Sequence, residues 1–376
     1  MNKIVITKLP LRYFYYFQYM IFGFQQLEKK NQIKFKLKAS TFREWFFYRF
    51  YYVFIIMFKF LKRFRSSIKN EYLLEGYFTD GENKVNFCYD IADSPHYYDV
   101  EKLKETDIYF KAQCPIEFKE SGFEIAPGAF LPYSPGSFDY LPKIFPSMLG
   151  PGFGVNNMYA YKRHKQKYNE MFVPEQVHHK SLMCFFGNAK GNRVVKSDNP
   201  DLYANESHIL GYFGEKVEHP NVKRSIAAKI ISDLLPDSDA RILHDGNCDV
   251  RHKPRKSPLF IHMKDFPHHI SHFKYNLNVS GHRMSIPYRF IHSFSVGTAI
   301  ITDKLKLKWY LPFGLEVFET VEMGYLPVEE VNWDGFEKDV KNLPKINPHE
   351  ILKTFHEKWS PQAFANYIIN TCKRKI

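Results

Sequence analysis

Residues 273–302 read FKYNLNVSGHRMSIPYRFIHSFSVGTAIIT, and this stretch decides the fold. The run Lys274–Val279 is typical of a buried strand, and a turn that contains Gly281 follows it. Apolar residues at helical spacing then predict a helix over Ser285–Val296, and Ala299–Thr302 has the composition of a second strand. A strand, a glycine-containing turn, a helix and another strand together predict a parallel β-α-β unit.

The same alternation of strand-like and helix-like segments occurs twice along the 376 residues. The first series follows a helical pattern at residues 14–27 and a period-two run at 33–38, and it covers residues 72–126. The second series begins at Ser181 and ends in two helical stretches within residues 348–372. Two such series predict an α/β protein of two units with mainly parallel sheets.

The turn after Val279 has the features of an anion site. A strand delivers the chain to this turn, and the free N–H groups at the start of a following helix can bind a phosphate. Arg283 and Arg289 lie near that helix start, and guanidinium groups bind diphosphates in bidentate fashion. Ligands of open α/β sheets bind at this end of the strands. An ordinary strand-turn-helix with surface arginines fits the same spacing.

Two segments resemble one group of glycosyltransferases. Residues 280–303, SGHRMSIPYRFIHSFSVGTAIITD, with Trp309-Tyr310 and GYLPV at 324–328, resemble the donor-binding region of the family of protein O-glucosyltransferases and fungal capsule xylosyltransferases. This group includes lipopolysaccharide-modifying enzymes, and exostosin-like glycosyltransferases have a similar core. Residues 184–193, CFFGNAKGNR, are similar to the F-x-G-x…R segment that opens the family's nucleotide-binding half. The likeness covers only the C-terminal half of the chain.

The resemblance implies a GT-B architecture, in which two Rossmann-like domains face a cleft. It implies an acceptor-side domain at 1–175, a nucleotide-sugar-binding domain at 176–345, and C-terminal helices at 346–376 that can cross back to the first domain. No obligatory metal or other cofactor is implied, because the nucleotide-sugar is a co-substrate. The positions that match the family's donor site are Gly187, Arg193, Gly281, Arg283, Ser285, Tyr288 and Arg289. Of these, Arg193, Ser285 and Arg289 would contact the diphosphate, while Gly187 and Gly281 would allow close backbone approach.

The sequence departs from the family pattern at three places. His282-Arg283 and Pro287 stand inside the motif, and Gly324 stands where the family often has His or Trp. The donor sugar and the fine contacts therefore stay open, as do the nucleotide base and the stereochemical outcome.

The same resemblance implies that the N-terminal half supplies a carboxylate as general base. The candidate segment is FCYDIADSP at 87–95, a strand that runs into a turn. Asp93, at the turn, is the first candidate and Asp90 the second, since a base must reach the acceptor hydroxyl at hydrogen-bond distance. The plainer alternative is that Asp93 and Ser94 form an Asx-type turn before Pro95.

The charge of the chain is concentrated at its start. The net charge is +13, and residues 1–70 hold 15 Lys and Arg against two acids, whereas the rest holds 38 of each sign. A helix is expected over Phe42–Arg65, with a cationic cluster near its end that consists of Lys59, Lys62, Arg63 and Arg65. Three interpretations stay open: a helix packed under a sheet, contact with an anionic membrane surface, and nucleic-acid binding. Nucleic acid is the least expected partner, because no RNP-like or zinc-finger pattern occurs.

Several classes of protein are excluded or disfavoured. The apolar content of 44% argues against disorder, and five scattered cysteines without a C-x-x-C pair argue against a disulfide framework or zinc site and favour a reducing compartment. The aromatic N-terminal stretch does not read as a secretory signal, and the uncharged run Phe50–Phe58 is too short to span a membrane. His268 with His272, and Asp237 with Asp239, lack the context of a metal site. We expect a cytoplasmic protein that can associate with the inner face of the membrane.

We therefore expect a glycosyltransferase that moves a sugar from a nucleotide-sugar donor to a glycan or lipid-linked acceptor in cell-surface polysaccharide synthesis. The alternative is a non-catalytic membrane-surface or carbohydrate-binding protein on the same scaffold.

Overall fold

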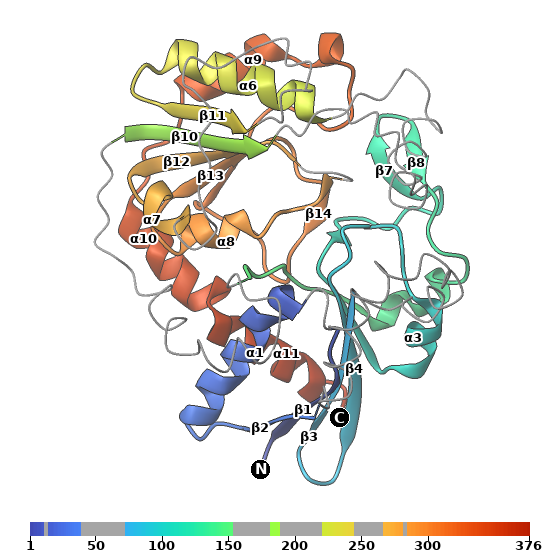
Figure 1. The fold of residues 1–376 in the computed structure, drawn as a ribbon. Helices are drawn as coiled ribbons and strands as arrows, with labels where there is room; N and C mark the ends of the chain where they lie inside the picture. Colours follow the sequence, from blue (N-terminus) through green and yellow to red (C-terminus); the bar gives the residue numbers. More distant parts are fainter. Residues whose placement is uncertain (11–13, 39–71, 153–180, 189–219, 244–265, 281–283) are drawn as a thin grey trace, which may run out of the picture.

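The computed structural model describes residues 1–10, 14–38, 72–152, 181–188, 220–243, 266–280 and 284–376. These residues form a mixed α/β fold with two larger sheets, one above the other in Figure 1, and two short two-stranded sheets. One contiguous hydrophobic cluster includes buried residues from both larger sheets. The predicted helix Phe42–Arg65, with Lys59, Lys62, Arg63 and Arg65, lies outside the described residues.

The first sheet has six strands in the order β2-β1-β3-β4-β5-β9. Their bounds are β1 Lys3–Lys8, β2 Lys34–Leu37, β3 Leu73–Thr79, β4 Lys84–Asp90, β5 Ile108–Lys111 and β9 Ile144–Pro146. The β1-β3 and β3-β4 pairs are antiparallel and the other pairs are parallel. The sequence pattern predicts a mainly parallel sheet and misses β1, whose central residues Ile4–Ile6 are fully buried.

The antiparallel pairing of β3 with β4 follows from their short connection. Only Asp80–Asn83 separate the two strands, and a parallel crossover needs a dozen or more residues. The Asp80 carboxylate accepts hydrogen bonds from the backbone N–H groups of Glu82 at 3.0 Å and Asn83 at 2.8 Å. Gly81 supplies the left-handed backbone of the turn, with φ of 117°.

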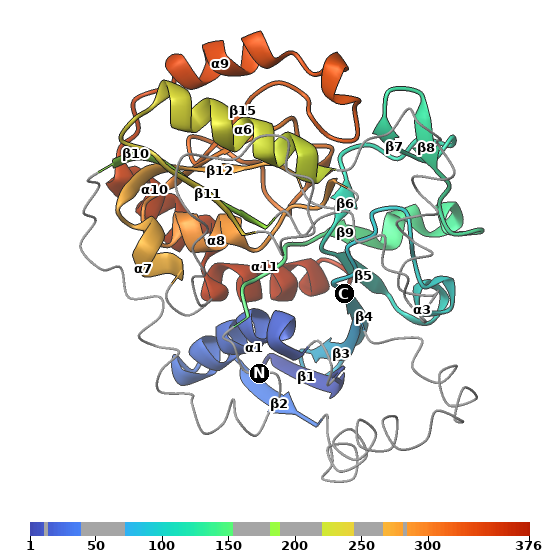
Figure 2. The same cartoon turned by 45° about the horizontal axis from the view of Figure 1, so that its top comes forward.

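Helices α1 (Phe14–Lys29) and α11 (Pro361–Lys373) pack against each other beside the first sheet, and α3 (Val100–Glu105) lies on its other side (Figures 1 and 2). Gly23 permits the close approach of α1 and α11, because a Cβ atom there would lie 1.9 Å from the carbonyl oxygen of Pro361. The Tyr19 hydroxyl donates to the carbonyl oxygen of Trp359 at 2.6 Å. The last helix is thus fixed to the first.

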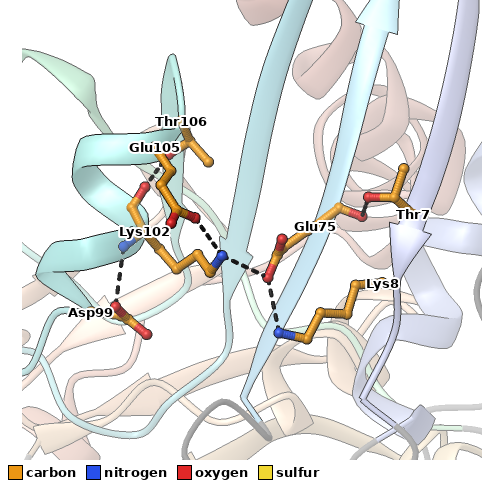
Figure 3. A network of polar contacts seen from close by, with 7 residues as sticks. All are labelled: Thr7, Lys8, Glu75, Asp99, Lys102, Glu105 and Thr106. Carbon is orange, nitrogen blue, oxygen red and sulfur yellow. Dashed lines mark hydrogen bonds and ion pairs between the residues drawn. The ribbon is translucent and has the colours of Figure 1, made fainter.

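Side-chain ion pairs hold α3 to the first sheet (Figure 3). The Asp99 carboxylate caps the helix by accepting from the backbone N–H of Lys102 at 3.1 Å. The Lys102 ammonium contacts Glu105 at 2.5 Å and Glu75 of β3 at 3.3 Å, and Lys8 of β1 contacts Glu75 at 3.0 Å. Because these groups are partly exposed, we expect the network to contribute about 1 kcal/mol or less.

The second sheet has five strands in the order β11-β10-β12-β13-β15, and every neighbouring pair is parallel. Their bounds are β10 Ser181–Asn188, β11 Asp239–Leu243, β12 Phe273–Asn278, β13 Ala299–Thr302 and β15 Val317–Glu319. Counted in chain order within the sheet, the strands lie as 2-1-3-4-5. The winding therefore reverses between β10 and β12, where doubly wound sheets have their ligand crevice.

Helices cover both faces of the second sheet (Figure 1). On one face lie α6 Pro220–Leu234 and α9 Trp333–Lys341, and on the other lie α7 Phe266–Ile270, α8 Arg289–Phe294 and α10 Pro348–Thr354. The remaining elements are the strands β7 Phe123–Ala126 and β8 Ala129–Leu131, the 3-10 helices Phe138–Lys143 and Val328–Glu330, and the π-helical turn Phe355–Trp359 that joins α10 to α11.

Helix α8 is shorter than the sequence predicts. The spacing favours a helix over Ser285–Val296, but α8 begins only at Arg289. Pro287 disfavours helical backbone at Ile286, and Met284 has a left-handed φ of 61°. The Gln113 side chain also pairs with Ile286, accepting from its N–H at 2.9 Å and donating to its carbonyl at 3.1 Å. Residues 285–287 therefore lie outside the helix, and Ser285 does not lie at a helix start.

The Gln113 contact belongs to a seam between the two sheets. Next to it, β6 (Cys114–Pro115) pairs antiparallel with β14 (Leu307–Lys308). The backbone N–H of Ile116 donates to the carbonyl of Lys306 at 3.1 Å. The chain that leaves β5 therefore runs directly alongside the segment that follows β13.

Within the described ranges, no helix is both long and apolar enough to cross a membrane.

Candidate functional site

The candidate site lies where β12 and β13 of the second sheet end. Asp303, directly after β13, is fully buried, and its carboxylate accepts from the N–H of Ser280 at 2.9 Å and from the Ser280 hydroxyl at 2.7 Å. It also accepts from the N–H of Gly324 at 3.3 Å. Burial raises the pKa of Asp303, and the hydrogen bonds from Ser280 oppose that rise. One carboxyl group thus holds three chain segments together at the carboxyl edge of the sheet.

The backbone around this carboxyl group is unusual at two residues. Met284 has φ of 61° and Gly324 has φ of 30°. A Cβ atom on Gly324 would lie 3.0 Å from the sulfur of Met284. Left-handed backbone at a residue other than glycine costs about 1 kcal/mol or more and is concentrated at functional sites.

Two arginine side chains meet at the same edge. Arg289, the first residue of α8, donates from Nη2 to the Asn278 side-chain oxygen at 3.1 Å. Arg224, in the first turns of α6, donates from Nη2 to the Ser280 carbonyl at 3.2 Å. Arg289 makes no ion pair with any described residue, and the acceptor of its hydrogen bond, the Asn278 amide oxygen, is uncharged.

The two guanidinium groups influence each other electrostatically. Burial lowers the pKa of Arg224 to about 10, with a further lowering by the positive charge of Arg289 and an opposing effect of Asp303. Burial also lowers the pKa of Arg289. Two cations that share one desolvated site repel each other, so an anion bound between them would be stabilised by both.

A buried histidine, His292, lies in α8 three residues after Arg289. The His292 side chain is 1% exposed, and neither ring nitrogen has a hydrogen-bond partner among the described residues. Burial, together with the charge of Arg289, lowers the pKa of His292 to about 3, so the ring is neutral at pH 7. Its ring lies edge-on to Tyr288, with centroids 5.5 Å apart.

Tyr288 connects this edge with the first sheet's helices. The ring of Tyr288 lies 6.0 Å from the ring of Tyr16 on α1. Burial raises the pKa of Tyr16, and Tyr15, the negative charge of Asp93, and Tyr288 raise it further. Tyr16 thus lies near the segment that carries Arg289, and the charge of Asp93 acts on its hydroxyl.

The two carboxylates at the end of β4 differ in their surroundings. Asp90 is 2% exposed, and its carboxylate contacts the Lys111 ammonium at 2.6 Å and the Tyr109 hydroxyl at 2.7 Å. The second oxygen of Asp90 accepts from the N–H of Ala92 at 2.7 Å, which is an Asx-type bond. Asp93 is exposed. Of the two candidate bases, Asp93 is the one that is exposed to solvent.

The other residues that the sequence singles out divide into two groups. Gly187 lies in β10, opposite Ile242 of β11, and Ser285 is buried in the irregular segment before α8. The others lie outside the described residues: Arg193, Gly281, Arg283, Lys59, Lys62, Arg63 and Arg65.

The sequence analysis misses Arg224, Asn278 and Asp303. A usable signal exists for two of them, since Asn278 lies near the end of the predicted strand Lys274–Val279 and Asp303 directly follows the predicted strand Ala299–Thr302. Arg224 has no such local signal, because only the crossover from β10 to β11 brings the start of α6 to this edge. No three His, Cys, Asp or Glu side chains of the described part of the chain are grouped so that they could hold a metal ion.

Comparison with known proteins adds little. No family model and no curated protein matches this chain. Among solved structures, a chain from the "Crystal structure of GtfA/B complex" is similar at 9% identity and a TM-score of 0.39, over 81% of this chain and 67% of that chain. A likeness of this size establishes no function.

Proposed function

We propose that this protein is a GT-B-type glycosyltransferase that moves a sugar from a nucleotide-sugar donor to a glycan or lipid-linked acceptor. The observation that carries the proposal is the pair of arginines, Arg224 and Arg289, at the carboxyl edge of a fully parallel sheet. Arg224, on the crossover that follows β10, reaches Ser280 after β12. The strand order reverses between these two strands, and such a point is the usual ligand position in doubly wound sheets. A diphosphate has the charge and the oxygen geometry that two guanidinium groups bind best.

The chemistry of the donor side follows from this pairing. When the bond from sugar to diphosphate breaks, negative charge develops on the leaving oxygens, and fixed positive groups stabilise that charge. The arginines are held by Asn278 and Ser280, and Ser280 is held by Asp303. The reaction needs no metal in this proposal, since the arginines supply the positive charge. Gly187, Gly281, Arg283, Arg193, Ser285 and Tyr288 belong to the proposed donor site through the sequence resemblance.

On the acceptor side, Asp93 is the proposed general base. It would take the proton from the acceptor hydroxyl as that oxygen attacks the anomeric carbon. Exposure supports Asp93 over Asp90, whose carboxylate oxygens already accept three hydrogen bonds. In this proposal residues 1–175 receive the acceptor, residues 176–345 bind the donor, and residues 346–376 join the two.

The basic residues of the N-terminal segment are the proposed membrane-contact surface. Lys59, Lys62, Arg63 and Arg65 are proposed to contact an anionic membrane on its cytoplasmic side, because clustered Lys and Arg beside aromatic residues bind such surfaces. Membrane contact would bring the acceptor cleft to a lipid-linked saccharide.

Calorimetric titration with uridine and guanosine diphosphates tests the donor site. Replacing Arg289 by Ala removes a charge-assisted contact worth about 1.5–3 kcal/mol, so Kd should rise about 10- to 100-fold. Lys229→Ala is the matched control, because Lys229 lies on the exposed side of α6, where it pairs with Asp233. Wild-type affinity in Arg289→Ala, or no binding of any nucleotide by the wild-type protein, would contradict the assignment.

Catalysis requires its own measurement. Transfer or donor hydrolysis with a panel of nucleotide-sugars should occur with the wild-type protein and fall by about 100-fold or more in Asp93→Asn. Nucleotide binding without any transfer would favour a non-catalytic binding protein on the same scaffold.

A further inference from the structure

A buried ion pair lies at the carboxyl ends of β4 and β5. The side chains of Lys111 and Asp90 are 0% and 2% exposed, and Nζ lies 2.6 Å from Oδ2. The Tyr109 hydroxyl donates to the same carboxylate oxygen at 2.7 Å. Full burial of both charges requires this close pairing, because either charge alone would be strongly destabilised by desolvation.

The pair holds the turn that follows β4 at two points. The other Asp90 oxygen accepts from the N–H of Ala92 at 2.7 Å, at the start of the turn. The Lys111 ammonium donates to the carbonyl of Tyr97 at 3.0 Å and lies 5.1 Å from the ring centroid of Tyr98, at its end. Asp93 lies between these two anchor points.

A second set of bonds fixes the far end of the turn independently. The N–H of Tyr98 donates to the Ser134 hydroxyl at 2.8 Å, and the N–H of Ser134 donates to the His96 carbonyl at 3.1 Å. Residues 96–98 are therefore held even without the ion pair. At the near end, the backbone N–H of Ile91 donates to the Tyr72 carbonyl at 3.0 Å, and the Asp90 carboxylate adds a side-chain bond at Ala92, next to Asp93.

Stability alone does not account for this arrangement. An apolar pair of similar volume is often as stable as a buried ion pair, or more stable, because it carries no desolvation cost. An apolar pair could not accept from Ala92 or donate to Tyr97. What the ion pair adds is directional bonding to the backbone on both sides of Asp93.

We propose that Asp90 and Lys111 are positioning residues, which hold the turn of residues 91–98 and thereby fix the position of the Asp93 carboxylate that the turn carries. This assignment rests on the proposed function, in which Asp93 is the base. It gives Asp90 a role different from that of an alternative base, since both of its oxygens are used to hold the turn.

A double-mutant cycle tests the proposal. In the otherwise wild-type protein, where Asp93 is present, Lys111→Met should lower kcat for sugar transfer by about 10- to 100-fold. Small displacements of a catalytic group lower the rate by that much. The affinity for uridine or guanosine diphosphate should not change. In the Asp93→Asn background, Lys111→Met should lower kcat no further, because Lys111 acts through Asp93. Equal losses in both backgrounds would overturn the positioning role.

Folding is controlled by a second variant. Asp90→Leu combined with Lys111→Met removes both charges, leaves no unpaired charge buried, and should fold while losing both anchors. Its kcat should fall as in Lys111→Met, and an unchanged kcat in this folded variant would overturn the proposal. Lys102→Met, in the same part of the molecule, is the control that should retain wild-type kcat. A wild-type protein that binds no nucleotide and transfers no sugar would overturn the proposed function and this role with it, whereas additive losses would overturn this role alone.

Discussion

The carboxyl edges of the two sheets both place positive side chains in desolvated surroundings, but they treat the charge differently. At the first sheet, Lys111 is neutralised by Asp90 at 2.6 Å. At the second sheet, Arg289 donates to the uncharged Asn278 side chain, and its charge acts on Arg224 and His292. The Asp303 carboxylate at that edge accepts from Ser280 and Gly324.

The difference indicates that the Lys111 charge stabilises the fold, whereas the Arg289 charge can bind a ligand. A paired charge has its counter-ion in the fold and serves to orient backbone. Arg289, whose hydrogen-bond acceptor is the neutral Asn278 amide, keeps its attraction for an anion from outside. Three of the substitutions below change or test the charge at one of the two edges, and the fourth, Lys102→Met, compares them with an exposed ion-pair network.

Breaking the pair at the first sheet should have the largest effect. Lys111→Met leaves the Asp90 carboxylate buried without its counter-ion, which typically costs about 3–5 kcal/mol of unfolding free energy. Urea unfolding of Lys111→Met and of the combined Asp90→Leu and Lys111→Met variant measures this cost. The combined variant should be the more stable of the two, and the opposite order would contradict the pairing.

The protonation of His292 reports how strongly the surroundings of Arg289 disfavour a further positive charge. The folded-state pKa of about 3 lies below the unfolded value of 6.5, so the unfolded chain takes up a proton first as the pH falls. The resulting contribution is fully present above about pH 6.5 and is lost at lower pH, by about 3 kcal/mol at pH 4.5.

The measurement is the dependence of stability on pH in His292→Leu. The loss of unfolding free energy between pH 7 and 4.5 should be smaller in this variant by about that amount. Equal slopes in the wild-type and variant proteins would mean that His292 protonates normally in the fold.

Asn278→Asp would pair the Arg289 guanidinium with a carboxylate, as Asp90 is paired with Lys111 at the first sheet. The new carboxylate would neutralise Arg289, so diphosphate affinity should fall about 10-fold or more, while the melting temperature should not decrease. Calorimetric titration and thermal unfolding of the same variant measure both effects. Unchanged diphosphate affinity would show that Arg289 does not face the ligand.

The exposed network on α3 should give the smallest effect. Lys102→Met removes two partly exposed ion pairs, and we expect a loss of about 1 kcal/mol or less. Urea unfolding in low and high salt checks it. A loss as large as that of Lys111→Met would mean that burial does not distinguish the two lysines.

Local pattern predicts the elements well where neighbours in sequence decide them. The strands near 273–278 and 299–302, and the helix that starts near Phe14, form as expected. Local pattern fails where a distant contact decides. The Gln113 side chain binds Ile286 and keeps α8 from starting early, and β1 becomes a central strand only because β2 and β3 flank it.

The candidate site shows the same limit. Sequence resemblance points to Arg289, but Arg224 lies 65 positions earlier and reaches the edge only through the sheet topology. The sequence alone makes Asp90 a candidate base, but in the fold its carboxylate is paired with Lys111. Partners that are far apart in sequence decide whether a charged residue binds substrate or holds the backbone.

The most direct measurement is calorimetric titration of uridine and guanosine diphosphates into the wild-type protein and the Arg224→Met and Arg289→Met double variant. We expect binding by the wild-type protein and a loss of affinity of about 100-fold or more in the folded double variant. Equal affinity in the two proteins would contradict the claim that the arginine pair is the diphosphate site.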